Sequence, residues 1–293
     1  MALVTGIRDL RRLPKAELHL HLAGAMRART PGDLDRLVRG AVADAAADGV
    51  VWFQPHFSPH VQGGPETWDA VLELVLAAGL DEAGRRGIGF GLTMALPRHE
   101  GPELAGELTR LAVRHVAQGV FALGLEGDEA AFPNGPFAPA FTAAREAGLT
   151  LAPHAGELSG PESVRDAIDL LGATRLAHGV RAVEDPTVVG LLVSRGVSLD
   201  IAISSNLSRG VYRELAEHPL PALLDAGVRC SLGADDATLF GPLLGEYELA
   251  RSGLGFTDER LAGLARTSLE TSDAPAELVA DAVAGIESWL TAP

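Results

Sequence analysis

Apolar runs of six to ten residues recur along the chain at fairly even intervals. Their alternating, β-branched character is typical of strands. Between most of them lie amphipathic segments with apolar residues three or four positions apart, as in helices that cover a sheet. The eight strand-like runs span residues 17–22, 50–57, 87–96, 120–127, 149–156, 174–180, 198–206 and 228–236.

This alternation predicts an α/β protein built as a (β/α)8 TIM barrel. The segment HPLPALLDAG, between the last two runs, leaves room for only a short helix. An open, doubly wound sheet is the competing topology, but no G-x-G-x-x-G follows the first run to support it. Two further helical patterns in residues 257–291 should pack outside the barrel.

Composition favours one domain over residues 1–293. Apolar residues make up 47% of the chain and charged residues 22%, which supports a large buried core, and no linker-like segment interrupts the pattern. The formal charge of −15 argues against a nucleic acid or an anionic membrane as partner, because both require a basic surface. The single cysteine, Cys230, cannot form a disulfide within the chain, which suits a reducing compartment. No apolar run reaches the length of about 18 residues that a membrane helix needs, so we expect a cytoplasmic protein.

Polar residues collect where the predicted strands end. In a (β/α)8 barrel the carboxyl ends of all strands meet on one face, which carries the chemistry. His19 and His21, two apart on the first strand, point to the same side of it. An isolated pair of this kind also suits two half-buried histidines bonded to backbone or water. The other strand ends carry His56, His154, Glu157, His178, Asn206, Asp235 and Asp236.

Several strands that deliver histidine or carboxylate to one face predict a metal site. Three histidines and one aspartate suit one Zn²⁺ per chain, with Fe²⁺ or Mn²⁺ as alternatives. Such an ion lowers the pKa of a bound water to about 7. Glu157, in HAGE, is placed to exchange protons with a substrate there, although a carboxylate at a helix N-terminus explains it equally well.

Several motifs resemble one known family, and they run in order from Pro14 to about Tyr247. They are PKAELHLHLAGAMR, HAGE, RLAHGV, SSNL, HPLPALLDAGVRCSLGADD and LFGPLLGEY. They are similar to the adenosine/adenine/AMP deaminase family of the amidohydrolase superfamily. The resemblance implies a (β/α)8 barrel with one zinc, which replaces the exocyclic amine at purine C6 by oxygen.

The resemblance also implies roles for individual residues. The zinc ligands would be His19, His21, His154 and Asp235. Glu157 would protonate purine N1, His178 would orient the attacking hydroxide, and Asp236 would hold it and pass a proton to the leaving amine. The candidates for substrate binding are His21, His56, Gly127, Asn206 and Arg209.

Two departures from the family pattern concern the substrate. Ala23 stands where the family usually has an acidic or amide residue, so the contact to a ribose 5′-hydroxyl is absent. Only 27 residues separate Ala23 from Val51, enough for one loop and one helix. We therefore expect a more open mouth, whose other loops offer Gln54, His60, Arg98 and His99.

The leading hypothesis is a zinc-dependent aminohydrolase that acts on a 6-aminopurine nucleoside or a close analogue. Nucleosides altered at the 5′ position, such as aminodeoxyfutalosine or 5′-methylthioadenosine, belong to this class. Deamination of another heterocycle or opening of a cyclic amide is the alternative among enzymes. A catalytically inactive binding protein is the alternative of a different class. The expected partner is a small aminopurine-type molecule. Assembly of the chain into a homo-oligomer is an open alternative to a monomer.

Overall fold

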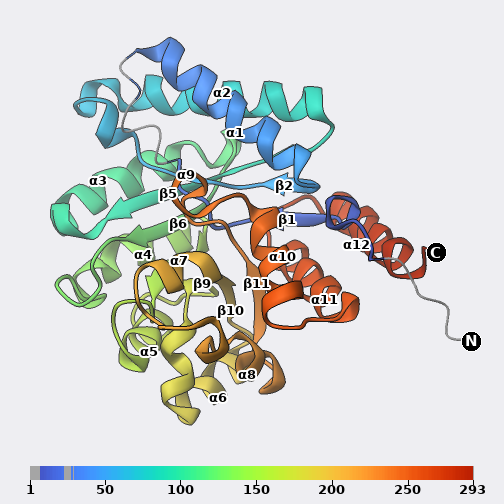
Figure 1. The fold of residues 1–293 in the computed structure, drawn as a ribbon. Helices are drawn as coiled ribbons and strands as arrows, with labels where there is room; N and C mark the ends of the chain where they lie inside the picture. The colour runs from blue at the N-terminus through green and yellow to red at the C-terminus, as the bar shows by residue number, and fades with distance from the viewer. Residues whose placement is uncertain (1–6, 23–27, 29, 293) are drawn as a thin grey trace, which may run out of the picture.

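Eight parallel strands form the centre of the computed structural model, which describes residues 7–22, 28 and 30–292 (Figure 1). Three of the eight are interrupted and count as two short pieces each. In chain order the pieces are β1 (Lys15–Glu17), β2 (Val50–Phe53) with β3 (His56–Phe57), β4 (Gly89–Phe90) with β5 (Leu92–Pro97), β6 (Val120–Glu126), β7 (Thr150–Leu151) with β8 (His154–Ala155), β9 (Arg175–His178), β10 (Ser198–Ile201) and β11 (Arg229–Leu232).

Strand one closes the barrel by pairing on both sides. β1 pairs with β2, and beyond β1 the same segment bridges the ends of strands eight and two. The His21 N–H donates to the Asp235 carbonyl at 2.6 Å, and the Leu22 N–H donates to the His56 carbonyl at 3.1 Å. Every pair is parallel, and each strand pairs with its neighbours in sequence. The predicted (β/α)8 barrel is confirmed.

Helices follow the strands and cover the outside of the barrel (Figure 1). The described part of the 27-residue interval after Ala23 contains one helix, α1 (Pro31–Ala47), which starts at a Thr30–Asp33 capping box. The next covering helices are α2 (Trp68–Arg86), α3 (Gly101–Arg114), α4 (Ala138–Glu146), α5 (Pro161–Asp169), α6 (Pro186–Arg195) and the short α8 (Leu220–Asp225). No helix in the described part of the chain has the length and apolar character needed to cross a membrane.

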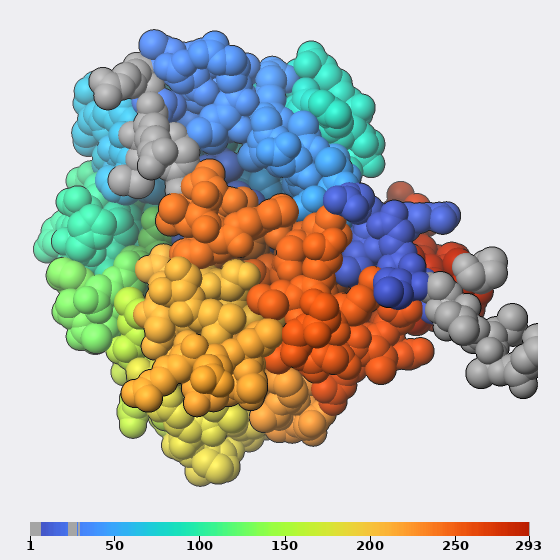
Figure 2. Space-filling model, viewed as in Figure 1, coloured from blue at the N-terminus to red at the C-terminus, as the bar shows by residue number. Residues whose placement is uncertain are grey.

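The C-terminal region adds α10 (Leu243–Gly253), α11 (Asp258–Glu270) and α12 (Ala276–Thr291). The last two confirm the helical patterns predicted in residues 257–291, and α11 packs on β1 and β11 outside the barrel. Figure 2 shows the first helical segment (blue) and residues around 240–270 (orange) side by side on one face. A hydrogen bond from the Leu244 N–H to Asp48 Oδ2, 3.2 Å long, joins these two parts of the chain.

The run at 198–206 is a strand only over its first half, which corrects the prediction. β10 ends at Ile201, and α7 (Ile203–Ser208) begins two residues later. The buried carboxylate of Glu246 on α10 accepts the Ile203 N–H at 2.6 Å and the Ser204 N–H at 3.2 Å. These are first-turn N–H groups that a helix cannot pair internally, so the carboxylate favours helix over strand at this point.

Gln54 lies inside the barrel, away from the mouth where the sequence suggested it. Its Nε2 donates to Asp273 Oδ2 at 2.7 Å, and Thr150 Oγ1 donates to the other carboxylate oxygen at 2.5 Å. Asp273 comes from the loop between α11 and α12, which brings a charge to the interior. Buried Arg175 pairs with Asp200 at 3.1 Å in the same region. The barrel interior is therefore a polar network as well as an apolar core.

Two glycines of α2 allow a matched test of packing against the barrel. A Cβ on buried Gly79 would lie 2.3 Å from Cζ of buried Phe90, whereas a Cβ on Gly84 would meet nothing within 4 Å. We expect Gly79→Ala to lower the free energy of unfolding by about 1–3 kcal/mol through overpacking. Gly84→Ala should raise it by about 0.5–1 kcal/mol through helix propensity. Urea denaturation measures both, and equal stability of the two variants would show that Phe90 moves aside.

Candidate active site

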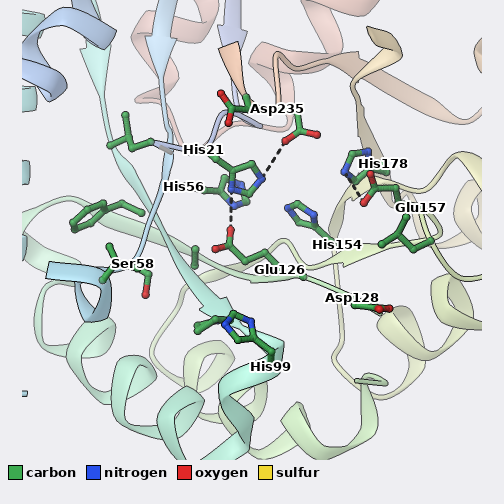
Figure 3. A pocket seen from close by; sticks show the side chains of 18 of the residues that line it. His21, His56, Ser58, His99, Glu126, Asp128, His154, Glu157, His178 and Asp235 are labelled. Carbon is green, nitrogen blue, oxygen red and sulfur yellow. Dashed lines mark ion pairs between the residues drawn. The ribbon is translucent and has the colours of Figure 1, made fainter. Parts of the chain in front are cut away.

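Three histidines and an aspartate converge at the carboxyl end of the barrel, and Figure 3 shows three of them, His21, His154 and Asp235. His19 and His21 lie on strand one, His154 on strand five and Asp235 at the end of strand eight. The ring centroids of His19 and His154 are 5.0 Å apart, as are those of His21 and His154. The possible ligand atoms of His19, His21 and Asp235 lie within 4.8 Å of one another. The structure thus brings together the residues that the sequence suggested as ligands.

The imidazoles are oriented so that one nitrogen of each faces the centre of this group. His19 Nδ1 lies 3.0 Å from the Asp200 carbonyl, and His21 Nδ1 lies 2.8 Å from Glu126 Oε2. With Nδ1 engaged on the outside, Nε2 is the nitrogen available to a cation. The Nε2 atoms of His19 and His154 are buried and have no hydrogen-bond partner among the described residues. Because an unpaired buried polar atom is costly, this donor set fits a bound divalent metal.

Burial gives these histidines different protonation preferences. It lowers the pKa of His19, and it lowers the pKa values of His154 and His178 well below the usual range. Burial also acts to lower the pKa of His21, but the carboxylate of Glu126 outweighs it and raises the value to about 9. Metal binding requires the neutral imidazole, so His21 would release its proton when a cation binds.

Glu17 connects two strands that carry the proposed ligands. Its Oε1 accepts the His19 N–H at 3.0 Å, and its Oε2 accepts the Ala234 N–H at 3.1 Å. These N–H groups belong to a candidate ligand and to the residue before Asp235. The sequence analysis did not single out Glu17, although a charged residue within an apolar strand is a usable signal for such a role.

Strained backbone conformations occur at two site residues. His178 has a φ of 66° and Asp235 a φ of 57°, and they alone have positive φ among the described residues other than glycine. Side chains other than glycine rarely adopt this left-handed region, which costs about 1–3 kcal/mol for each residue. Both residues end a strand and turn their side chains toward the histidines, so this conformation accompanies the geometry of the site.

Glu157 lies beside His178 at the wall of the cavity. Its Oε2 is 3.4 Å from His178 Nε2, and its Oε1 is 3.2 Å from Arg209 Nε. Burial raises the pKa of Glu157 to about 7; Arg209 opposes this shift, and Asp235 adds to it. A carboxyl group with this pKa can both give and accept a proton at neutral pH.

Glu129, which the sequence analysis did not identify, holds the loop that carries Glu157. Its Oε1 accepts the N–H groups of Glu157, Leu158 and Ser159 at 2.7, 2.6 and 3.0 Å, and its Oε2 accepts the Gly156 N–H at 2.9 Å. One buried carboxylate therefore satisfies four consecutive backbone donors. The acidic run GDE after strand four is the signal that could have pointed to it.

A cavity of about 480 Å³ opens onto the histidines, within the range of about 300–1,000 Å³ for small-molecule sites. Gly127, Arg209 and Asp236 line it as expected, and one oxygen of Asp236 accepts the Thr238 N–H at 2.9 Å. The other lining residues include His56, Ser58, His60, His99, Glu126 and Asp128. The cavity thus has an acidic, histidine-rich wall.

His56 is buried beside His21, with the ring centroids 5.0 Å apart and its Nδ1 unpaired among the described residues. Together with His21, Glu126 and His154 it forms another group that could hold a metal. His21 belongs both to this group and to the group with Asp235, so the two groups describe alternative positions for one metal ion. The arrangement with Asp235 agrees with the set inferred from the sequence.

Asn206 and Arg98, which the sequence analysis named, do not line the cavity. Asn206 is fully buried behind His178 and does not line the cavity, because its amide bonds to His178 and His218. Ala23, on which the argument about the 5′ position depends, lies outside the described residues. Arg98, whose role the sequence left open, is buried, and its Nη2 donates to the His154 carbonyl at 2.6 Å.

Comparisons with known proteins agree with the resemblance. The adenosine deaminase family profile matches residues 27–289. A relative from Streptomyces coelicolor named "Putative adenosine/adenine deaminase" is 37% identical over an alignment of 341 residues, covering 98% of this chain and 99% of the relative. An aminodeoxyfutalosine deaminase from Acidothermus cellulolyticus is 36% identical over 225 residues, covering 72% of this chain and 62% of that protein.

Solved structures share the barrel along almost the whole chain. An adenine deaminase from Arthrobacter aurescens matches with a TM-score of 0.87 at 25% identity, over 96% of this chain and 100% of that one. An amidohydrolase from Burkholderia ambifaria with bound Zn matches with a TM-score of 0.87 at 24% identity, over 99% and 96%, which shows the fold alone. With the profile covering most of its length and a 37% identical relative matching nearly all of it, this chain belongs to the adenosine deaminase family of amidohydrolases and is a hydrolytic deaminase.

Proposed function

We propose that this protein is a zinc-dependent deaminase of 6-aminopurine nucleosides, including nucleosides altered at the 5′ position. The observation that carries the proposal is the convergence of unpaired, buried histidine nitrogens on Asp235, with the carboxyl group of Glu157 at the wall of the same cavity. The named relatives include adenosine/adenine and aminodeoxyfutalosine deaminases, which supports an aminopurine as substrate.

His19, His21, His154 and Asp235 would hold the metal, with Fe²⁺ or Mn²⁺ as alternatives to Zn²⁺. When bound, the ion would supply Lewis-acid chemistry that lowers the pKa of water enough for attack at neutral pH. Asp200 and Glu126 hold the Nδ1 sides of His19 and His21, and such outer partners usually set ligand orientation.

Glu157 would donate its proton to N1 of the purine, which makes C6 more electrophilic. Its raised pKa, about 7, keeps a substantial fraction of the carboxyl group protonated at neutral pH. His178 and Asp236 would orient the attacking water, and Asp236 would return a proton to the leaving amine. In the balanced reaction one water is consumed, the C6–N bond breaks, ammonia leaves and C6 becomes a carbonyl.

The charge of the cavity favours a substrate without a phosphate group. Among the described residues, five carboxylates line it, from Glu126, Asp128, Glu157, Asp235 and Asp236, against the single guanidinium of Arg209. A divalent cation and Arg209 together carry three positive charges, fewer than the five carboxylates and fewer than the four that stay charged when Glu157 is protonated. A dianionic phosphate would meet like charges, which disfavour binding. We therefore propose that the substrate is a nucleoside and not a nucleotide. We also propose that residues 1–293 form one catalytic domain and that the protein acts in the cytoplasm.

Glu157→Gln tests the acid without altering the proposed ligands. We expect turnover to fall by a factor of about 100 or more, because the amide cannot supply the proton. Metal content should be unchanged, whereas Asp235→Ala should lose the metal. Ammonia release and elemental analysis of the purified proteins measure both effects. An active Glu157→Gln enzyme would remove Glu157 from the mechanism.

Glu129→Gln tests whether one carboxylate positions the loop that carries the acid. The new NH₂ group would face backbone donors, so N–H groups of residues 156–159 should exchange with deuterium roughly tenfold faster or more. Turnover should fall while metal content is retained. Glu162→Gln, an exposed glutamate on α5, is the matched control and should change neither. Unaltered exchange in Glu129→Gln would contradict the positioning role.

A substrate panel tests the ring and its 5′ group. Adenine, adenosine, 5′-deoxyadenosine, 5′-methylthioadenosine, aminodeoxyfutalosine and AMP are compared by ammonia release from the zinc-loaded enzyme. We expect kcat/KM for AMP to be roughly tenfold or more below that of the best uncharged nucleoside. AMP as the best substrate would refute the charge argument. If no 6-aminopurine reacts while aminated pterins or pyrimidines do, the reaction is deamination of another heterocycle.

A further inference from the structure

A chain of hydrogen bonds leads from the start of α8 to the catalytic face. His218 Nδ1 accepts the Leu220 N–H at 3.3 Å, and His218 Nε2 lies 3.2 Å from Asn206 Oδ1. Asn206 Nδ2 lies 3.1 Å from His178 Nδ1, and His178 Nε2 lies 3.4 Å from Glu157 Oε2. His218, Asn206 and His178 are all buried.

The direction of every bond in this chain follows from its first member. A backbone N–H can only donate, so His218 Nδ1 carries no proton. Burial lowers the pKa of His218 to about 4, so at neutral pH the ring is uncharged and its one proton is on Nε2. That N–H must donate to Asn206, which requires the amide oxygen at this position.

The Asn206 amide therefore has one allowed orientation. With its oxygen toward His218, its NH₂ group faces His178 and donates to Nδ1. His178 Nδ1 is then an acceptor without a proton, and its Nε2 carries the hydrogen. The reverse orientation would bring two N–H donors together in a buried space.

The proton on His178 Nε2 also limits which residues can bind the metal. The possible ligand atoms of His19, His154 and His178 lie within 4.8 Å of one another. An imidazole nitrogen that carries hydrogen has no lone pair for a cation. In this tautomer His178 is excluded from coordination and presents a donor to the cavity.

We propose that His218 is a positioning residue that, through Asn206, holds His178 in the Nε2–H tautomer and so keeps it a hydrogen-bond donor to the reacting water instead of a metal ligand. The catalytic part rests on the proposed function, whereas the tautomer is a property of the protein itself. His218 does not line the cavity, so it acts through His178 and not on the substrate.

His218→Phe removes the donor while keeping a ring of similar size. Nitrogen-15 NMR of labelled histidines distinguishes the two tautomers, and the His178 signal is identified by its loss in His178→Asn. We expect the wild type to show His178 as Nε2–H alone and His218→Phe to show a mixture. With zinc retained, kcat should fall by roughly 10- to 100-fold and KM should change less.

Two further variants separate positioning from a general structural role. His218→Gln offers an N–H to Asn206 and should restore the Nε2–H tautomer and most of kcat. Asn206→Asp has nearly the same shape but only acceptor atoms, and should move the His178 proton to Nδ1. His115→Phe replaces another buried histidine, whose Nδ1 bonds to the Leu111 carbonyl, and should leave the His178 tautomer unchanged.

The outcomes separate this proposal from the proposed function. A wild-type His178 protonated on Nδ1, or an unchanged tautomer in both His218→Phe and Asn206→Asp, would overturn the proposal. If His218→Phe fails to fold, as thermal melting would show, Asn206→Asp carries the test. If the tautomer shifts as expected but the wild type deaminates no aminopurine, the proposed function fails and the relay stands.

Discussion

The active site depends on keeping one nitrogen of each clustered histidine free while the ring is buried. Each imidazole has two nitrogens, and the outer one is held by a different group: the Asp200 carbonyl for His19, the Glu126 carboxylate for His21 and the Asn206 amide for His178. In the neutral ring, an oxygen partner at Nδ1 leaves Nε2 of His19 and His21 free of hydrogen, whereas the amide donor puts hydrogen on Nε2 of His178. In the proposed assignment, this difference separates the metal ligands among these histidines from the hydrogen-bond donor.

Strand pairing provides the rigidity that this division requires. The segment after β1 is hydrogen-bonded to strands two and eight at the level of His21, Asp235 and His56. Glu17 adds a second connection, between the backbone of strand one and that of strand eight. Asp235 keeps its left-handed backbone conformation because these surrounding bonds over-determine its position. The barrel is therefore rigid at the place where the donor atoms must converge.

Much of this arrangement could be predicted from the sequence, because period-two alternation and strand ends determine which side chains share the catalytic face. His19, His21, His154 and Asp235 follow from that rule. Glu17, Glu129 and His218 could not be predicted in the same way, because each acts on backbone or amide groups distant in the sequence. The helix at Ile203 was missed for the same reason, since its N-terminus is capped by Glu246, more than forty residues later. The Gln54 side chain points into the barrel because it donates a hydrogen bond to Asp273, which comes from the loop between α11 and α12. A partner so distant in the sequence could not be predicted.

The proposed metal ligands and the proposed acid are positioned by different parts of the fold. His19, His21, His154 and Asp235 belong to strands whose backbones are held on both sides. Glu157 belongs to a loop beyond strand five, and ladder hydrogen bonds do not reach it. A loop this close to the chemistry needs its own source of order, and the carboxylate of Glu129 supplies it through four backbone N–H groups. The same negative charge adds to the burial that raises the pKa of Glu157, so one residue both places the acid and favours its protonated form.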